Sequence, residues 1–132
     1  MLVDTNVLVD LLEDDPEWAD WSVAQLRAQS QLHKLCINPV IYAELSLTFS
    51  TFEALDEVLD SLRLPVIELP RPALFLAGKA FAQYRRRGGT KANVLPDFFI
   101  GAHAAVARWP VLTRDASRYA SYFPTVALVT PD

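Results

Sequence analysis

The chain has 132 residues, of which 52% are hydrophobic and 21% are charged. This composition excludes an intrinsically disordered chain, and the length is that of a single domain spanning residues 1–132. The longest uncharged apolar run, residues 98–107, is far shorter than the ~20 residues that a membrane-spanning helix requires, so we expect no contact with a membrane. The acidic start lacks the pattern of a secretory signal, which makes the cytoplasm the expected location. The single cysteine, Cys36, lies in an apolar run and is expected to be a buried core residue.

The formal net charge of −4 is unevenly distributed along the chain. Residues 1–68 contain thirteen acidic and three basic residues, whereas residues 69–132 contain three acidic and nine basic residues. A basic second half suggests contact with a polyanion, although the oppositely charged solvated faces of an ordinary domain would give the same counts.

Short apolar runs alternate with helical patterns along the chain. Strands are predicted at residues 1–4, 34–37, 65–69, 110–113 and 125–130, and helices at residues 6–13, 15–31, 38–49, 50–64, 72–88, 95–109 and 115–123. Asp15 and Asn38, each followed by proline, have the pattern of helix N-caps, and Ser50 with Glu53 has capping-box spacing. Gly88 is expected to end the long basic helix. Continuous apolar strands separated by helices predict an α/β fold whose parallel sheet is covered on both faces.

Four carboxylates lie where this fold would bring them to one edge of the sheet. Asp4 ends the first strand, Asp115 follows the fourth, and the carboxyl ends of parallel strands share an edge where ligands bind. Glu44 lies on the apolar stripe of its helix, where a buried and unpaired charge costs on the order of several kcal/mol. Asp97 opens a helix whose buried face carries small residues such as Gly101. Each acid also has an ordinary interpretation, as a helix cap or, for Glu44, as a side chain turned to solvent.

Carboxylates gathered this closely repel one another, and a divalent cation removes the repulsion. An oxygen-only ligand set favours Mg²⁺ or Mn²⁺ over zinc. His33 and His103 do not fit the site and are expected to be structural or surface residues. An aspartyl-phosphate phosphatase would need a second aspartate where Asn6 stands, and the chain has no dinucleotide-binding, P-loop or nucleophile-elbow motif.

Four segments in order, "LVDTNVLVDLL", "NPVIYAEL", "RRRGGTKANVLPDFFIGAHA" and "VLTRDASRY", resemble the PIN-domain family, specifically the small VapC-like toxin ribonucleases of type II toxin–antitoxin pairs. The resemblance spans nearly the whole chain. It implies a PIN-like three-layer sandwich with a five-stranded parallel sheet flanked by helices. It also implies a Mg²⁺- or Mn²⁺-dependent endoribonuclease whose catalytic and metal-binding residues are Asp4, Glu44, Asp97 and Asp115.

The resemblance further implies supporting residues and partners. Thr5, Asn6 and Thr113 match polar positions that would fix the carboxylates by hydrogen bonds. Six basic residues are candidates for binding RNA phosphates: Arg85, Arg86, Arg87, Lys91, Arg114 and Arg118. For the three consecutive arginines, a solvated helix end is an equally good interpretation. A cognate antitoxin and a homodimer are also implied; Trp18 and Trp21 could line the antitoxin groove, although a core position is favoured for both.

Two other functions remain open at this point. One is a PIN-domain nuclease that processes or matures RNA; a chain consisting of the catalytic domain alone favours the toxin. The other, less favoured, is a non-catalytic interaction domain in which the four acids are caps. Asp10 has no assigned role and is expected at the surface.

Overall fold

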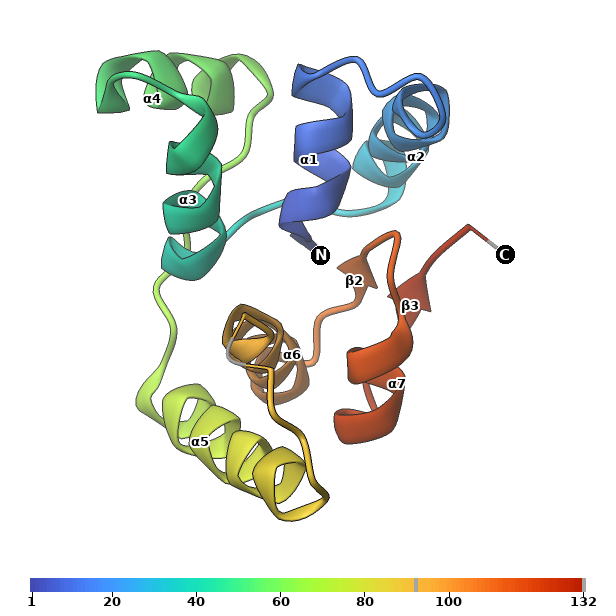
Figure 1. Cartoon of the computed structure of the whole chain (residues 1–132). Coiled ribbons are helices and arrows are strands. Elements are labelled where there is room, and N and C mark those ends of the chain that lie inside the picture. The colour runs from blue at the N-terminus through green and yellow to red at the C-terminus, as the bar shows by residue number, and fades with distance from the viewer. Residues whose placement is uncertain (92, 132) are drawn as a thin grey trace.

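The computed structural model describes residues 1–91 and 93–131, in which short strands alternate with helices (Figure 1). The elements, in chain order, are β1 (Leu2–Val3), α1 (Thr5–Leu12), α2 (Ala19–Leu32), α3 (Pro39–Leu45), the 3-10 turn η1 (Ser46–Thr48), α4 (Phe52–Ser61), α5 (Arg71–Arg86), α6 (Leu95–Ala107), β2 (Val111–Leu112), α7 (Ser117–Tyr122) and β3 (Leu128–Val129). None of these helices is long and apolar enough to cross a membrane.

The sheet is parallel, in the order β1-β2-β3, which confirms the α/β class. On the free side of β1, Leu2 pairs with Cys36 in an isolated parallel bridge, and Ile37 pairs likewise with Val66. Of the five strands expected, three are therefore regular strands within the described residues, and two are single bridges. Prolines explain the difference, because Pro39 opens α3 directly after one bridge and Pro65 precedes the other, and neither can donate a ladder hydrogen bond.

Helices cover both faces of the strands. In Figure 1, α1 to α4 lie on one side of the strands and α5 to α7 on the other. The residues of β1 and β2 are completely buried between these layers. Burial of each such side chain contributes roughly 1.5–3 kcal/mol, and Cys36 joins the same core as expected.

The helix starts agree with the sequence in one case and differ in two. Asn38 caps α3 as predicted, accepting the amide three residues on at 3.0 Å. For α4 the cap is Thr51, not Ser50, because the Thr51 hydroxyl accepts the amide of Ala54. The second predicted helix begins at Ala19 rather than at residue 15, since the Asp15 carboxylate holds a turn that precedes α2.

Gly101 allows α6 to pack closely on the segment that follows α7. A Cβ at this position would clash with carbons at the edge of the Phe123 ring, and Phe123 is only 3% exposed. A Cβ on Gly78 in α5, by contrast, would meet no atom within 4 Å.

We therefore expect opposite effects from two Gly→Ala substitutions. Gly101→Ala should lower the free energy of unfolding by about 1–3 kcal/mol through overpacking, whereas Gly78→Ala should raise it by up to about 1 kcal/mol through helix propensity. Urea unfolding followed by circular dichroism measures both. Equal effects of the two substitutions would show that the contact with Phe123 does not limit packing.

Candidate active site

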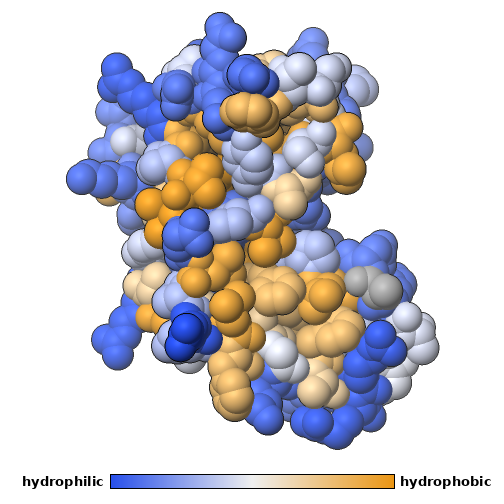
Figure 2. All heavy atoms as spheres, turned by 90° about the vertical axis from the view of Figure 1, so that its left-hand side faces the viewer, coloured by the Kyte–Doolittle hydropathy of each residue, from blue (hydrophilic) through white to orange (hydrophobic). Residues whose placement is uncertain are grey.

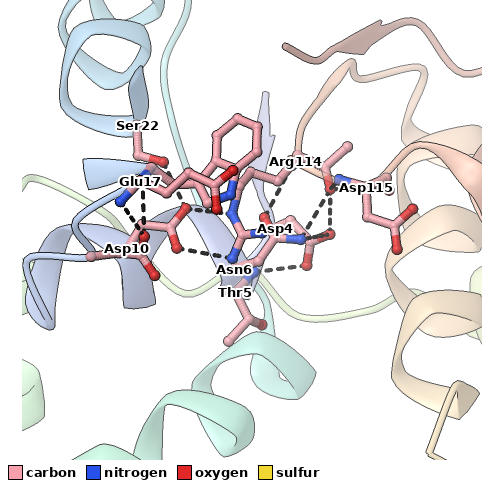
Figure 3. Close-up of polar contacts among 11 residues, drawn as sticks. Asp4, Thr5, Asn6, Asp10, Glu17, Ser22, Arg114 and Asp115 are labelled. Atoms are coloured by element: carbon pink, nitrogen blue, oxygen red, sulfur yellow. Dashed lines mark hydrogen bonds and ion pairs between the residues drawn. The ribbon is translucent and has the colours of Figure 1, made fainter. Parts of the chain in front are cut away.

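Asp4 is the buried centre of the site (Figure 3). It follows β1 and caps α1, with the amide of Thr5 donating to Oδ1 at 2.7 Å. Its Oδ2 accepts the hydroxyls of Thr113, at the end of β2, and Tyr119, in α7, each at 2.8 Å. Burial raises the pKa of Asp4, and these hydrogen bonds only partly offset that rise. Three separate elements therefore hold one carboxylate in a fixed orientation.

Glu44 approaches from α3. It is half-buried, and the Thr5 hydroxyl donates to its Oε1 at 2.6 Å, which links it to the residue that follows Asp4. Burial, followed by repulsion from Asp4, raises the pKa of Glu44. The apolar surroundings predicted for Glu44 are present, because it lines a surface hollow together with Val40, Leu47 and other apolar residues.

Asp97 lies in the first turn of α6, and its pKa is strongly raised. Burial is the largest cause, and repulsion from Asp4, Glu44 and Asp115 adds to it, so that the pKa rises from 3.8 to about 7. Arg118, whose Nη1 lies 3.8 Å from Asp97 Oδ2, opposes the rise.

Asp115 differs from the other three acids because it is exposed. Its Oδ1 accepts the amide of Ser117 at 3.1 Å and the hydroxyl of the same residue at 2.8 Å. These bonds lower the pKa of Asp115. The carboxylate thus bonds the first residue of α7 much as the helix cap considered from the sequence would, although Ala116 occupies the cap position itself, and it remains near the other acids.

The four acids lie close enough to influence one another, since the pKa of Asp97 responds to all of the other three. Their donor atoms are exclusively carboxylate oxygens, the type that Mg²⁺ and Mn²⁺ prefer. Within residues 1–91 and 93–131, however, no three His, Cys, Asp or Glu side chains are gathered closely enough to form a ready-made metal site. The residue chemistry thus fits a hard divalent cation, while the spacing does not by itself identify one.

The supporting residues predicted from the sequence contact these acids. The Asn6 amide donates to the Thr113 hydroxyl at 3.3 Å, and Asn6 Oδ1 accepts the amide of Arg114 at 3.1 Å. Tyr119 was not anticipated, although it stands four residues after Asp115 in a predicted helix, which places both on one face. Its pKa lies well above the ordinary value because it is buried beside Asp4, so its hydroxyl remains a proton donor.

The prediction that Asp10 lies at the surface is wrong. Asp10 is 1% exposed and forms an ion pair with Arg114. Its position one helical turn after Asn6 was the available signal. An aspartate is usually exposed, but Asp10 can be buried because Arg114 and Ser22 pair with its carboxylate.

The other candidate RNA-binding residues lie at two places. Arg85, Arg86 and Arg87 are exposed at the C-terminal end of α5, and Lys91 is exposed shortly after it. Arg118 lies among the acids, and its Nε is buried without a hydrogen-bond partner among the residues that the structure describes.

The remaining polar and aromatic candidates are structural. His103 is buried and its Nδ1 lies 3.2 Å from the amide nitrogen of Asn38, whereas His33 is exposed. Trp18 and Trp21 pack edge to face, and Trp21 also contacts the core. Both side chains are only partly buried: Trp21 packs against the core rather than lying within it, and Trp18 lies against Arg114.

The opposite pKa shifts of Asp97 and Asp115 predict opposite pH effects in chelator. The folded protein keeps a proton on Asp97 that the unfolded chain releases, so this group lowers stability as the pH rises from about 4 to 7. Asp97→Asn should therefore raise the melting temperature at pH 8 and have little effect near pH 4. Asp115 has a lowered pKa, so its charge stabilises the fold at any pH above the ordinary pKa of an aspartate. Asp115→Asn should therefore lower the melting temperature at pH 8. Thermal unfolding in EDTA across this range checks both, and shifts of the same sign would contradict the assignment.

Comparisons with known proteins agree with this architecture. The PIN domain family matches residues 1–121. A comparison with curated protein sequences finds no match.

Solved structures of similar fold include three from bacteria. VapBC2 from Rickettsia felis, bound to a DNA fragment from its promoter, has a TM-score of 0.75 and 20% identity, covering 99% of this chain and 98% of that chain. VapBC-1 from nontypeable Haemophilus influenzae has a TM-score of 0.73 and 17% identity, covering 98% and 96%. A toxin–antitoxin complex from Klebsiella pneumoniae has a TM-score of 0.69 and 22% identity, covering 99% and 97%. At these identities the likeness shows the fold alone; the match over residues 1–121 shows that the chain belongs to the PIN domain family.

Proposed function

We propose that this protein is a Mg²⁺- or Mn²⁺-dependent endoribonuclease and the toxin of a toxin–antitoxin pair. The observation that carries the proposal is a set of four neighbouring carboxylates: the buried Asp4, which accepts three hydrogen bonds, and the carboxylates of Glu44, Asp97 and Asp115 close to it. A fold needs no such arrangement for stability, because Asp4, Glu44 and Asp97 each cost free energy when they are charged at these buried or partly buried positions. Membership of the PIN domain family and the toxin–antitoxin complexes among the similar folds support the proposal.

Asp4, Asp97 and Asp115, with Glu44 directly or through water, would hold the metal. When bound, the metal would lower the pKa of a water for attack on a phosphodiester and stabilise charge on the leaving oxygen. The residues of the chain prepare this site: Thr113 and Tyr119 orient Asp4, and Thr5 orients Glu44.

Arg118 and the basic end of α5 would hold the RNA phosphates. The guanidinium of Arg118 lies 6.0 Å from the Tyr84 ring, and that of Arg87 lies 5.3 Å from the Tyr122 ring. Since these two rings contact each other, the aromatic cluster connects the arginines of α5 to the acids. A phosphate chain could therefore follow basic side chains up to the carboxylates, whose own charge repels it.

Two apolar surfaces are available for protein partners. One is a hollow of about 360 Å³ between α1, α2 and the end of α4, whose apolar lining residues are Leu11, Val23, Leu26, Leu35, Leu62 and Leu64; we assign it to the antitoxin. The other surrounds Glu44 and includes Leu47, which is 87% exposed. Figure 2 shows hydrophobic side chains gathered in a band on the side of the molecule that carries α3 and α5. This second surface supports the proposed homodimer.

The two other functions differ in what they require. An RNA-processing PIN nuclease would use the same acids, and the likeness to toxin–antitoxin complexes favours the toxin. A non-catalytic domain would use the acids only as caps. Asp97 does not fit that interpretation, because no hydrogen bond to its carboxylate is found among the described residues and its pKa is raised rather than lowered.

Metal binding gives the first test of the nuclease proposal. Millimolar Mn²⁺ should raise the melting temperature relative to EDTA, because a ligand bound only to the folded state stabilises it, by about 2.7 kcal/mol at one hundred times its dissociation constant. Na⁺ at matched ionic strength serves as the control. The absence of any shift with Mn²⁺ or Mg²⁺ would favour caps over ligands.

Replacing one acid should separate activity from stability. Asp97→Asn is expected to lower RNA cleavage roughly 100-fold or more, since it removes a proposed metal ligand, while leaving the metal-free protein as stable or more stable at pH 8. Asp4→Asn should also abolish cleavage, and Glu57→Gln, an exposed acid in α4, is the matched control. Full cleavage by either aspartate variant would falsify the mechanism.

A further inference from the structure

Arg114 is held at two points by a single helix. Its backbone amide donates to Asn6 Oδ1 at 3.1 Å, and its guanidinium bonds both oxygens of Asp10, Nε to Oδ2 at 2.6 Å and Nη2 to Oδ1 at 2.9 Å (Figure 3). Asn6 and Asp10 are one turn apart in α1 and therefore lie on the same face. Helix α1 thus fixes both the main chain and the side chain of the residue that stands between Thr113 and Asp115.

The ion pair is built into the protein rather than lying on its surface. The Asp10 side chain is 2% exposed and that of Arg114 is 29% exposed. The Ser22 hydroxyl, from α2, donates to Asp10 Oδ2 at 2.9 Å, and the Trp18 ring lies 5.3 Å from the guanidinium carbon. Buried pairs of this kind often stabilise a fold no more than apolar residues would, so the fixed geometry that the pair imposes is its more informative property.

The geometry matters because Asp115 is held only locally. It is exposed, and its carboxylate accepts hydrogen bonds from Ser117, two residues away. Its amide donates to the Thr113 hydroxyl at 3.1 Å, and that hydroxyl also donates to Asp4 Oδ2. The position of Asp115 relative to Asp4 therefore depends on the path of the main chain through Arg114.

We propose that Asp10 and Arg114 form a positioning pair that sets Asp115 against Asp4 for the nuclease reaction, and that Arg114 is not an RNA contact. The inference rests on the proposed function and changes the role first considered for Arg114. The Asp10 carboxylate already neutralises the positive charge of Arg114 and holds its guanidinium in a fixed orientation through two hydrogen bonds, so this arginine offers a phosphate less attraction than an unpaired one would. A positioning role predicts that loss of Arg114 weakens metal binding and leaves RNA affinity unchanged, whereas a phosphate contact predicts the reverse.

The test measures metal binding and RNA binding separately. Arg114→Gln should weaken Mn²⁺ binding, measured by calorimetry without RNA, by roughly 10- to 100-fold, as loss of a residue that orients a metal ligand does. It should lower kcat on a fluorescent mixed-sequence single-stranded RNA and leave KM and the salt dependence of RNA affinity unchanged. Arg114→Lys should remain impaired, because lysine keeps the charge but cannot make the bidentate contact. Arg71→Gln, which removes an exposed arginine at the start of α5, is the charge-matched control.

A double variant guards against misfolding. Asp10→Asn/Arg114→Met removes both charges together, so that neither is left buried alone, and should fold while reproducing the loss of Mn²⁺ affinity. A raised KM with unchanged Mn²⁺ affinity, together with a shallower salt dependence, would overturn the inference and make Arg114 a phosphate contact. Variants that match the unmodified protein in every measurement would also overturn it. If the unmodified protein itself neither binds Mn²⁺ nor cleaves RNA, the proposed function fails, and the positioning role fails with it.

Discussion

The burial of one carboxylate, that of Asp4, constrains the rest of the structure. The first strand has two residues, and the chain turns into α1 immediately afterwards, so Asp4 must be both the end of a strand and the cap of a helix. A charge enclosed in this way is tolerated only when donors surround it. Thr113 and Tyr119 supply them, which fixes where β2 ends and where α7 lies. The short sheet and the site are therefore specified by the same hydrogen bonds.

A second consequence is electrostatic. Glu44, Asp97 and Asp115 are held near Asp4 by their own helix or loop positions. Burial first, and then repulsion from the other three acids, raises the pKa of Asp97 to about 7. Arg118 relieves this only partly at 3.8 Å. Such a site lowers the stability of the metal-free fold, and functional sites commonly carry a cost of this kind. The repulsion is also what a divalent cation would relieve, which connects the instability of the site with its proposed chemistry.

The sequence predicted the elements that local patterns determine. Asn38 as a cap, Glu44 among apolar neighbours and the parallel pairing of the strands all follow from the chain itself. It did not predict Tyr119 or Asp10, because their roles depend on partners more than 100 residues away along the chain. The two predicted strands at residues 34–37 and 65–69 are only single bridges in the structure. An apolar run shows that a segment is buried, whereas the length of a ladder also depends on flanking prolines.

The same long-range pairing refines the meaning of the charge asymmetry. The acidic first half and basic second half suggested a polyanion surface, but one basic residue, Arg114, is matched internally by an acid of the first half. Part of the asymmetry is therefore intramolecular complementarity between α1 and the loop after β2. Arg85 and Arg87 at the end of α5 are different, because they are exposed and lie over aromatic rings rather than carboxylates. A phosphate backbone would meet these cations first and the acids only afterwards, so attraction and catalysis would occupy separate parts of one surface.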